Sequence, residues 1–151
     1  MRRSIVTLLG LLILLAIAGC RSGPPPTNDA NQGLAARRQG AVGQLQGVIV
    51  IDPKCSNFAQ KDDQIVCIVN QGKTDVTIGG WEIRNTIGRT YFFPKGFVLA
   101  AGKSVRLHTG AGTNSSTDLY WNYQFKPVFD AEDQLSLVDD GSVVISQYTT
   151  P

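Results

Sequence analysis

Residues 80–94 read Gly-Trp-Glu-Ile-Arg-Asn-Thr-Ile-Gly-Arg-Thr-Tyr-Phe-Phe-Pro, and this stretch decides the fold. Apolar and charged residues alternate over 81–84, which is the period-two pattern of a strand with one buried face. Residues 85–88 have turn chemistry, because Asn and Gly tolerate the positive φ that reverses a chain. A second strand follows at 91–93, and the next proline ends it because proline cannot donate to a ladder. The stretch therefore predicts a hairpin that places Trp81, a large apolar side chain, in a β core.

Short β-rich runs of the same kind recur from Gly47 to the end of the sequence, with Gly, Pro, Asn and Asp between them. Asp140-Gly141 lies between two apolar runs, which is a strong hairpin signal. No ten-residue segment of this region has helical periodicity. Its 105 residues are enough for one small domain. We therefore predict an all-β sandwich or barrel over residues 47–151.

The N-terminus has the composition of an export signal. Two arginines precede an apolar run over 5–18, and the small residues Ala18 and Gly19 lead to Cys20. The run is short for a membrane span, which needs about 20 apolar residues. Residues 1–19 resemble the signal peptide of bacterial lipoproteins, in which the cysteine is acylated, for example with palmitate, and becomes the first mature residue. An uncleaved helical anchor is the alternative. We expect a lipid-anchored protein on the extracytoplasmic face of a cell-envelope membrane.

Residues 20–46 are rich in Pro, Gly, Asn, Gln and Ala and carry few apolar side chains. Such a segment buries too little surface to offset the entropy of ordering it. It predicts a flexible tether with an r.m.s. span of roughly 25–30 Å.

The three cysteines divide into one and two. If Cys20 carries the lipid, Cys55 and Cys67 remain, in an oxidising compartment where a disulfide persists. Cys67 lies between Val66 and Ile68, and if those two face the core, Cys67 points outward toward the loop that holds Cys55. We therefore predict a Cys55–Cys67 disulfide.

Six motifs, taken in order, resemble the lamin tail domain, an immunoglobulin-like module of nuclear intermediate filaments and of many exported bacterial proteins. They are Asn70-x-Gly72, the run from Gly80 to Gly88, Phe93-Pro94, Leu99-x-x-Gly102-x-x-Val105, Trp121-Asn122, and the run from Asp133 to Val143. The resemblance covers 48–148 and implies an immunoglobulin-like β-sandwich. It also implies an accessory or anchoring part, because such modules accompany exported nucleases and other hydrolases. No coiled-coil heptads occur, so no filament rod is implied.

Charge argues against nucleic acid as a partner. From Gly47 onward there are nine basic and eleven acidic residues, a net charge of −2, whereas phosphate binding needs a basic excess. The charges are unevenly spread: 73–106 holds six basic and two acidic residues, and 118–140 holds one basic and six acidic. These segments either pair internally or form opposite poles that favour association.

Signals for catalysis and for a cofactor are weak. The single histidine, His108, alternates with Arg106 on the polar side of a strand and is expected at the surface. No serine or cysteine nucleophile motif accompanies it, so we predict no catalytic residue. The acidic run 130–133, with Asp139 and Asp140, offers oxygens for Ca²⁺ but lacks the alternating carboxylates of known calcium loops. We therefore expect neither a metal nor another cofactor.

Four aromatic residues lie in the six residues from Tyr120 to Phe125. Trp121 matches a tryptophan of the family and is expected to be packed, with Tyr123 and Phe125 on its side and Tyr120 facing the other way. The polar loop 110–117, expected to be exposed and mobile, leads into them. These aromatics are either ordinary core with one amphipathic tyrosine or a recognition surface. We take Tyr120, Tyr123 and Phe125 as the candidate partner-binding residues.

The sequence thus favours a membrane-anchored, non-catalytic binding module whose protein or glycan partner it does not name. One alternative is a module that binds glycan or peptidoglycan through coplanar exposed aromatics. The other is a secreted hydrolase or nuclease whose carboxylate and histidine cluster forms only in the folded chain.

Overall fold

The computed structural model describes residues 43–151, and the predicted signal peptide (1–19) and most of the predicted tether (20–46) lie outside that range. It contains ten strands and is all-β, as predicted. They are β1 (Ile49–Ile51), β2 (Ile65–Asn70), β3 (Val76–Thr77), β4 (Glu82–Arg84), β5 (Thr90–Phe92), β6 (Val98–Leu99), β7 (Ser104–His108), β8 (Asp118–Tyr120), β9 (Gln134–Val138) and β10 (Val144–Thr149). In residues 43–151 no helix is both long and apolar enough to cross a membrane.

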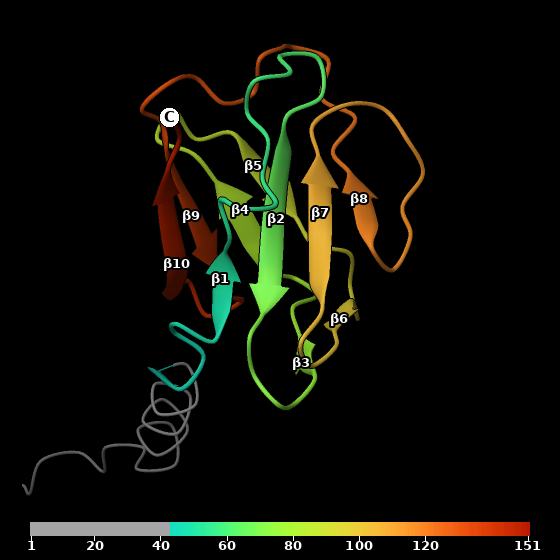
Figure 1. Ribbon diagram of the computed structural model, residues 1–151, viewed down its shortest axis with the longest axis vertical. Coiled ribbons are helices and arrows are strands. Elements are labelled where there is room, and N and C mark those ends of the chain that lie inside the picture. Colours follow the sequence, from blue (N-terminus) through green and yellow to red (C-terminus); the bar gives the residue numbers. More distant parts are fainter. Residues whose placement is uncertain (1–42) are drawn as a thin grey trace, which may run out of the picture.

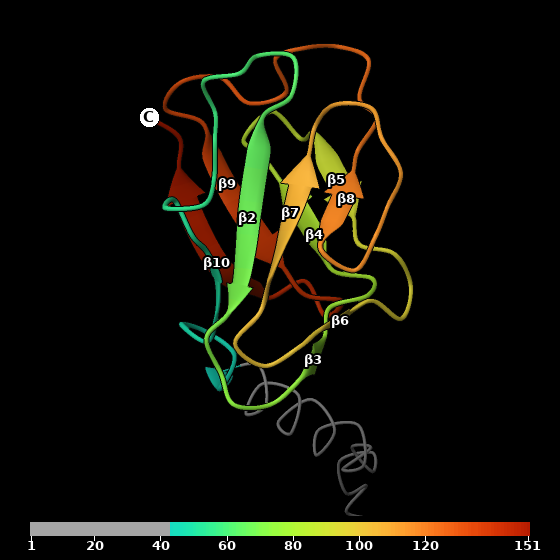
Figure 2. The same cartoon turned by 45° about the vertical axis from the view of Figure 1, so that its right-hand side comes forward.

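Two four-stranded sheets, ordered β1-β2-β7-β8 and β10-β9-β4-β5, lie face to face, and β3 and β6 form a short ribbon at one end (Figures 1 and 2). All pairings are antiparallel except that of β7 with β8, which is parallel. The core between the sheets is built from alternate strand residues, including Val66 and Ile68 of β2 and Leu135 and Leu137 of β9, all fully buried. This is an immunoglobulin-like sandwich.

The hairpin of residues 80–94 forms as predicted, with Ile83 opposite Tyr91 in the β4–β5 register. Trp81 is only 4% exposed and belongs to the core, and Gly88 supplies the positive φ of the turn at 83°. Asn85 acts differently from the prediction. It does not adopt positive φ but is buried and accepts the N–H of Arg89 on its Oδ1 at 2.8 Å. The turn therefore depends on a side-chain hydrogen bond as well as on glycine.

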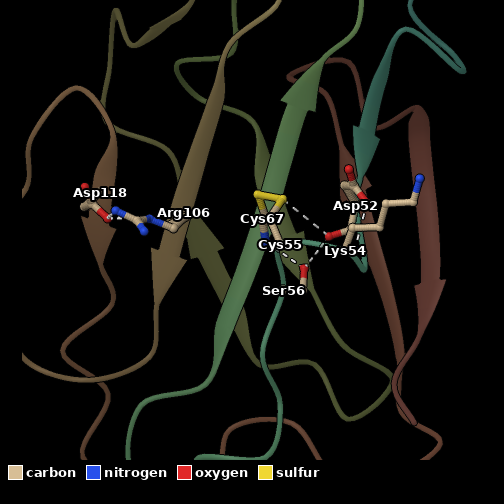
Figure 3. Close-up of a disulfide and its surroundings, with 7 residues drawn as sticks. All are labelled: Asp52, Lys54, Cys55, Ser56, Cys67, Arg106 and Asp118. Atoms are coloured by element: carbon tan, nitrogen blue, oxygen red, sulfur yellow. Dashed lines mark hydrogen bonds and ion pairs between the residues drawn. A yellow bond between two sulfur atoms is a disulfide. The ribbon is translucent and has the colours of Figure 1, made fainter.

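The Cys55–Cys67 disulfide is present, with the two Cα atoms 5.5 Å apart. Cys67 points outward from β2 but is fully buried, because the segment 52–57 folds across it (Figure 3). Ser56 strengthens this cover by accepting the N–H of Cys67 on its Oγ at 2.9 Å and by donating to the carbonyl of Asp52 at 2.8 Å. The bond thus fastens a loop onto the outer face of one sheet.

Candidate binding edge of the sandwich

The segment that follows β8 carries three of the four clustered aromatics in a row of ring contacts. Trp121 packs against Tyr91 with ring centroids 5.8 Å apart, and against Tyr123 at 5.4 Å. Tyr123 in turn contacts Phe125 at 6.1 Å. Exposure rises along the row, since Trp121 and Tyr123 are half-buried whereas the Phe125 side chain is 72% exposed. The row runs from the core to the solvent.

Arg89, in the β4–β5 turn, holds this segment in place. Its guanidinium donates to the carbonyls of Pro127 and Val128 at 2.8 and 2.6 Å, and lies 5.8 Å from the centroid of the Tyr123 ring. A cation over a tyrosine ring contributes about 0.5–1 kcal/mol at a partly exposed site. No sequence pattern predicts this contact, because Arg89 and Pro127 are 38 residues apart.

Tyr120 does not belong to this row. Its ring is half-buried and stacks on His108 with centroids 4.6 Å apart. The backbone of Gly112 lies against the same ring, so close that a Cβ there would come within 2.3 Å of it. Tyr120 thus contacts His108 and Gly112, whereas Tyr123 contacts Trp121 and Phe125. Because its ring is covered, the candidate surface is carried by Tyr123 and Phe125.

His108 is not the surface histidine that the sequence indicated, since its side chain is only 12% exposed. Its Nδ1 lies 2.8 Å from a carboxylate oxygen of Asp63, and its Nε2 lies 3.2 Å from one of Asp118. Both ring nitrogens of His108 therefore face a carboxylate oxygen. The group links the loop before β2 to β7 and β8.

Asp63, His108 and Asp118 form a bridge between these elements, and both of its carboxylates have lowered pKa values. Burial alone would raise the pKa of Asp63, but hydrogen bonds from His108 and the Gly110 N–H, with the charges of His108 and Lys126, together lower it below 3.8. For Asp118 the hydrogen bond from Thr117 lowers the pKa most; burial opposes it, and contacts with His108 and Arg106 lower it further.

The bridge predicts a loss of stability in acid. A carboxyl group whose pKa is lower in the folded state stabilises the fold above its unfolded pKa of about 3.8. That contribution is lost as the pH falls through the folded value. We expect Asp118→Asn to be less stable than wild type at pH 6 but to lose less stability between pH 6 and pH 3, as measured by urea unfolding.

Asp140→Asn is the matched control, because it removes an exposed carboxylate from the β9–β10 turn. A pH dependence of Asp118→Asn equal to that of wild type would contradict the role given to the bridge.

The loop over 110–117 is exposed from Ala111 onward, as predicted, but Gly110 is buried and donates its N–H to Asp63 at 2.9 Å. Hydrogen bonds also fasten the loop to its surroundings. Gly112 donates to Asn122 Oδ1 at 3.0 Å, and Asn114 Oδ1 accepts the N–H of Tyr120 at 2.8 Å. The loop therefore covers the edge of β8.

Two of the acidic residues considered for Ca²⁺, Asp133 and Asp139, hold the fold together by hydrogen bonds. Asp133 is buried and accepts hydrogen bonds from Asn85 at 2.8 Å and from Thr86. Asp139 accepts the N–H groups of Gly141 and Val143 at 2.9 and 2.7 Å, which fixes the β9–β10 turn. Among residues 43–151 no three His, Cys, Asp or Glu side chains are grouped so as to hold a metal ion.

A cavity of about 250 Å³ is bordered by Phe58, Phe129 and Pro127, the last of which accepts a hydrogen bond from Arg89. Gln64 lines it, but its amide is already used. The nitrogen donates to the carbonyls of Phe58 and Phe129 at 3.3 and 2.6 Å. Its oxygen accepts the N–H groups of Val128 and Phe129 at 3.0 and 2.9 Å. Gln64 thus supports the loop beneath the aromatic segment and offers no free polar atom to a ligand.

The geometry defines an immunoglobulin-like β-sandwich with an aromatic segment at one edge. The model of the Lamin Tail Domain family matches residues 45–151, and the chain belongs to this family. The resemblance read from the six sequence motifs is therefore confirmed. No curated protein matches the chain.

Proposed function

We propose that this protein is a lipid-anchored, extracytoplasmic binding module that contacts its partner through Tyr123 and Phe125. The observation that carries the partner surface is the exposure of Phe125, which is 72% exposed although its ring contacts that of Tyr123. A large apolar ring left in water costs solvation free energy, which contact with a partner recovers. Arg89 fixes the adjacent ring, so little side-chain entropy is lost on binding.

The position of this surface agrees with an anchor at the N-terminus. The described part of the chain enters the sandwich at the lower end in Figure 1, whereas the loop after β8 lies at the upper end. A domain tethered through residues 20–46 would therefore present the loop after β8 away from its point of attachment. The family match agrees with a binding role, because an immunoglobulin-like sandwich offers loops and edges on a rigid scaffold.

A protein partner fits this surface better than a glycan. Sugar-binding platforms use coplanar exposed rings, but the rings of Tyr123 and Phe125 meet at 69°, and Tyr123 is half-buried. Tyrosine and arginine are enriched in protein-binding hot spots, and here the Arg89 guanidinium lies beside the Tyr123 ring.

The anchor is tested at Cys20, which lies outside the described residues. We expect Cys20→Ser to abolish metabolic labelling with a fatty acid and to block processing of the N-terminal segment. Cys55→Ser, which removes a different cysteine, is the control and should leave labelling intact. Labelling that persists in Cys20→Ser would show that the anchor is not at this residue.

The surface is tested by crosslinking the anchored protein in its native envelope and measuring the amount of partner recovered. Phe125→Ser should change the free energy of unfolding by no more than about 0.5 kcal/mol, because the ring is mostly in solvent. Recovery of the partner should fall about tenfold or more, since an exposed aromatic anchor contributes 2 kcal/mol or more.

Val98→Ser is the matched control, because Val98 is also an exposed apolar residue, at 50%, but lies on the separate β3–β6 ribbon. Undiminished recovery with Phe125→Ser, or an equal loss with Val98→Ser, would place the binding surface elsewhere.

A further inference from the structure

β5 (Thr90–Phe92) is the last strand of the sheet β10-β9-β4-β5. Hydrogen bonds at both ends of the β4–β5 pair show which backbone groups it uses. Asn85 donates its N–H to the carbonyl of Arg89 at 3.1 Å, and Phe93 donates its N–H to the carbonyl of Trp81 at 2.8 Å. In an antiparallel ladder such bonds involve every second residue of each strand.

Arg89, Tyr91 and Phe93 therefore direct their backbone groups to β4, and Thr90 and Phe92 direct theirs the opposite way. Among residues 43–151 no acceptor is found for the backbone N–H of Thr90 or of Phe92. These two residues leave two donors and two acceptors in an extended row on the outer side of β5.

The neighbouring edge of the other sheet is closed. On β8, Asp118 donates its N–H to Ser115 Oγ at 3.0 Å and accepts the N–H of Ser115 at 2.7 Å. Tyr120 donates its N–H to Asn114 Oδ1 at 2.8 Å. The loop over 110–117 thus pairs the outer groups of β8, whereas no segment of residues 43–151 does so for β5.

The side chains of β5 do not protect this edge either. Edge strands are usually guarded by charged residues, a bulge or a proline within the strand. β5 instead carries Phe92, whose side chain is 64% exposed, and the first proline follows two residues later. Ile87, in the turn that leads into the strand, is 62% exposed. The edge therefore combines free backbone groups with apolar surface.

Charge and position indicate what would bind there. Arg84 lies beside Thr90 in the β4–β5 register, and Arg89 precedes the strand, while Glu82 is the acidic residue of β4 and forms an ion pair with Arg84 at 3.3 Å. Lys95 follows the strand, so the hairpin has a basic excess. Ring contacts of Tyr91 with Trp121 at 5.8 Å also bring β5 next to the aromatic segment.

We propose that β5 binds an extended, acidic segment of the partner polypeptide, which adds to the sheet as a fifth strand beside Tyr123 and Phe125. This proposal rests on the proposed function, because it names the partner class for the same edge of the sandwich. Unpaired N–H and C=O groups in an extended row select a polypeptide strand. Phe92 selects an apolar side chain at one position of that strand, and the basic hairpin selects carboxylates at its other positions.

The test measures amide exchange with water by NMR on the full chain in zwitterionic detergent micelles. The probe is an acetylated heptapeptide of alternating glutamate and valine. At saturating peptide we expect exchange at Thr90 and Phe92 to slow about tenfold or more, because their N–H groups gain acceptors. Exchange at Tyr91 should change little, because its N–H already faces β4.

Two variants and a matched control locate the effect. Thr90→Pro removes one outward N–H without removing a bond to β4, which is where an edge strand tolerates proline. Phe92→Glu keeps the backbone groups but removes the apolar contact and repels the acidic peptide. Val98→Glu makes the same kind of change on the β3–β6 ribbon. We expect both β5 variants to bind the peptide about tenfold or more weakly than wild type does. The control should bind it like wild type.

Three results would overturn the proposal. One is unchanged exchange at Thr90 and Phe92 with saturating peptide. Another is equal slowing of exchange at Thr90 and Phe92 by a peptide of alternating lysine and valine, which would show that charge does not select the ligand. The third is slowing that rises with protein concentration in the absence of peptide, which would identify a second copy of this chain as the occupant. If any of these occurs while Phe125→Ser still reduces partner recovery, the binding surface stands and only strand addition fails.

Discussion

Trp81→Ala should lower the free energy of unfolding by about 3–5 kcal/mol, the usual cost of removing a large aromatic side chain from a core. Trp81 is 4% exposed and packs with the residues that fill the space between the two sheets. A domain of this size has about 5–15 kcal/mol in total, so the variant would keep only a part of its stability. Urea unfolding followed by tyrosine fluorescence measures the change.

Trp81→Phe is the matched control and should lose less, because most of the buried ring area remains. A Trp81→Ala protein as stable as wild type that had lost only its partner would show that Trp81 is a binding residue and not part of the core.

Cys55→Ser should destabilise the fold by about 3 kcal/mol. The bond closes a loop between residues 12 apart, and in the chain-entropy model a loop of this length contributes about that much by restricting the unfolded chain. Cys55 is exposed, so the substitution leaves the packing of the sandwich intact and removes only the covalent link. The segment 52–57 then loses its fastening to β2. Urea unfolding of oxidised wild type and of the variant gives the difference.

Reduction of wild type should lower the unfolding midpoint to that of Cys55→Ser and should not change the variant further. Equal midpoints for oxidised wild type and the variant would show that Ser56, with its hydrogen bonds to Cys67 and Asp52, is enough to hold the loop.

The sequence left open whether the basic segment 73–106 and the acidic segment 118–140 pair with each other, and the structure answers part of that question. Among residues 43–151 one arginine–aspartate ion pair joins the basic segment to the acidic one, between Arg106 and Asp118 at 2.7 Å. Arg89 bonds to backbone carbonyls, and Asp133 accepts from uncharged donors. Arg84 pairs with Glu82, so three of the six basic residues of 73–106 are engaged within the domain. Within residues 43–151 the three lysines of this segment form no ion pair, and Lys95, which follows β5, is available to an acidic ligand there.

The sequence alone determined those features that depend on neighbouring residues. Alternation over 81–84 placed Trp81 in the core, because side chains of a strand point alternately to its two faces. Asp139 to Gly141 predicted a turn, and the structure has the β9–β10 turn there. The disulfide followed from counting, because only two cysteines remain once Cys20 is set aside.

Only the tertiary structure decided which strands meet and which edges stay open. The contacts of His108 with Asp63, of Arg89 with Pro127 and of Gln64 with Phe129 join residues 45, 38 and 65 apart. The sequence pattern gives the face on which a side chain lies but not its neighbour across a sheet, because strand order depends on long-range pairing. For that reason the open edge at Thr90 and Phe92 could not be read from the chain, although the hairpin that forms it could.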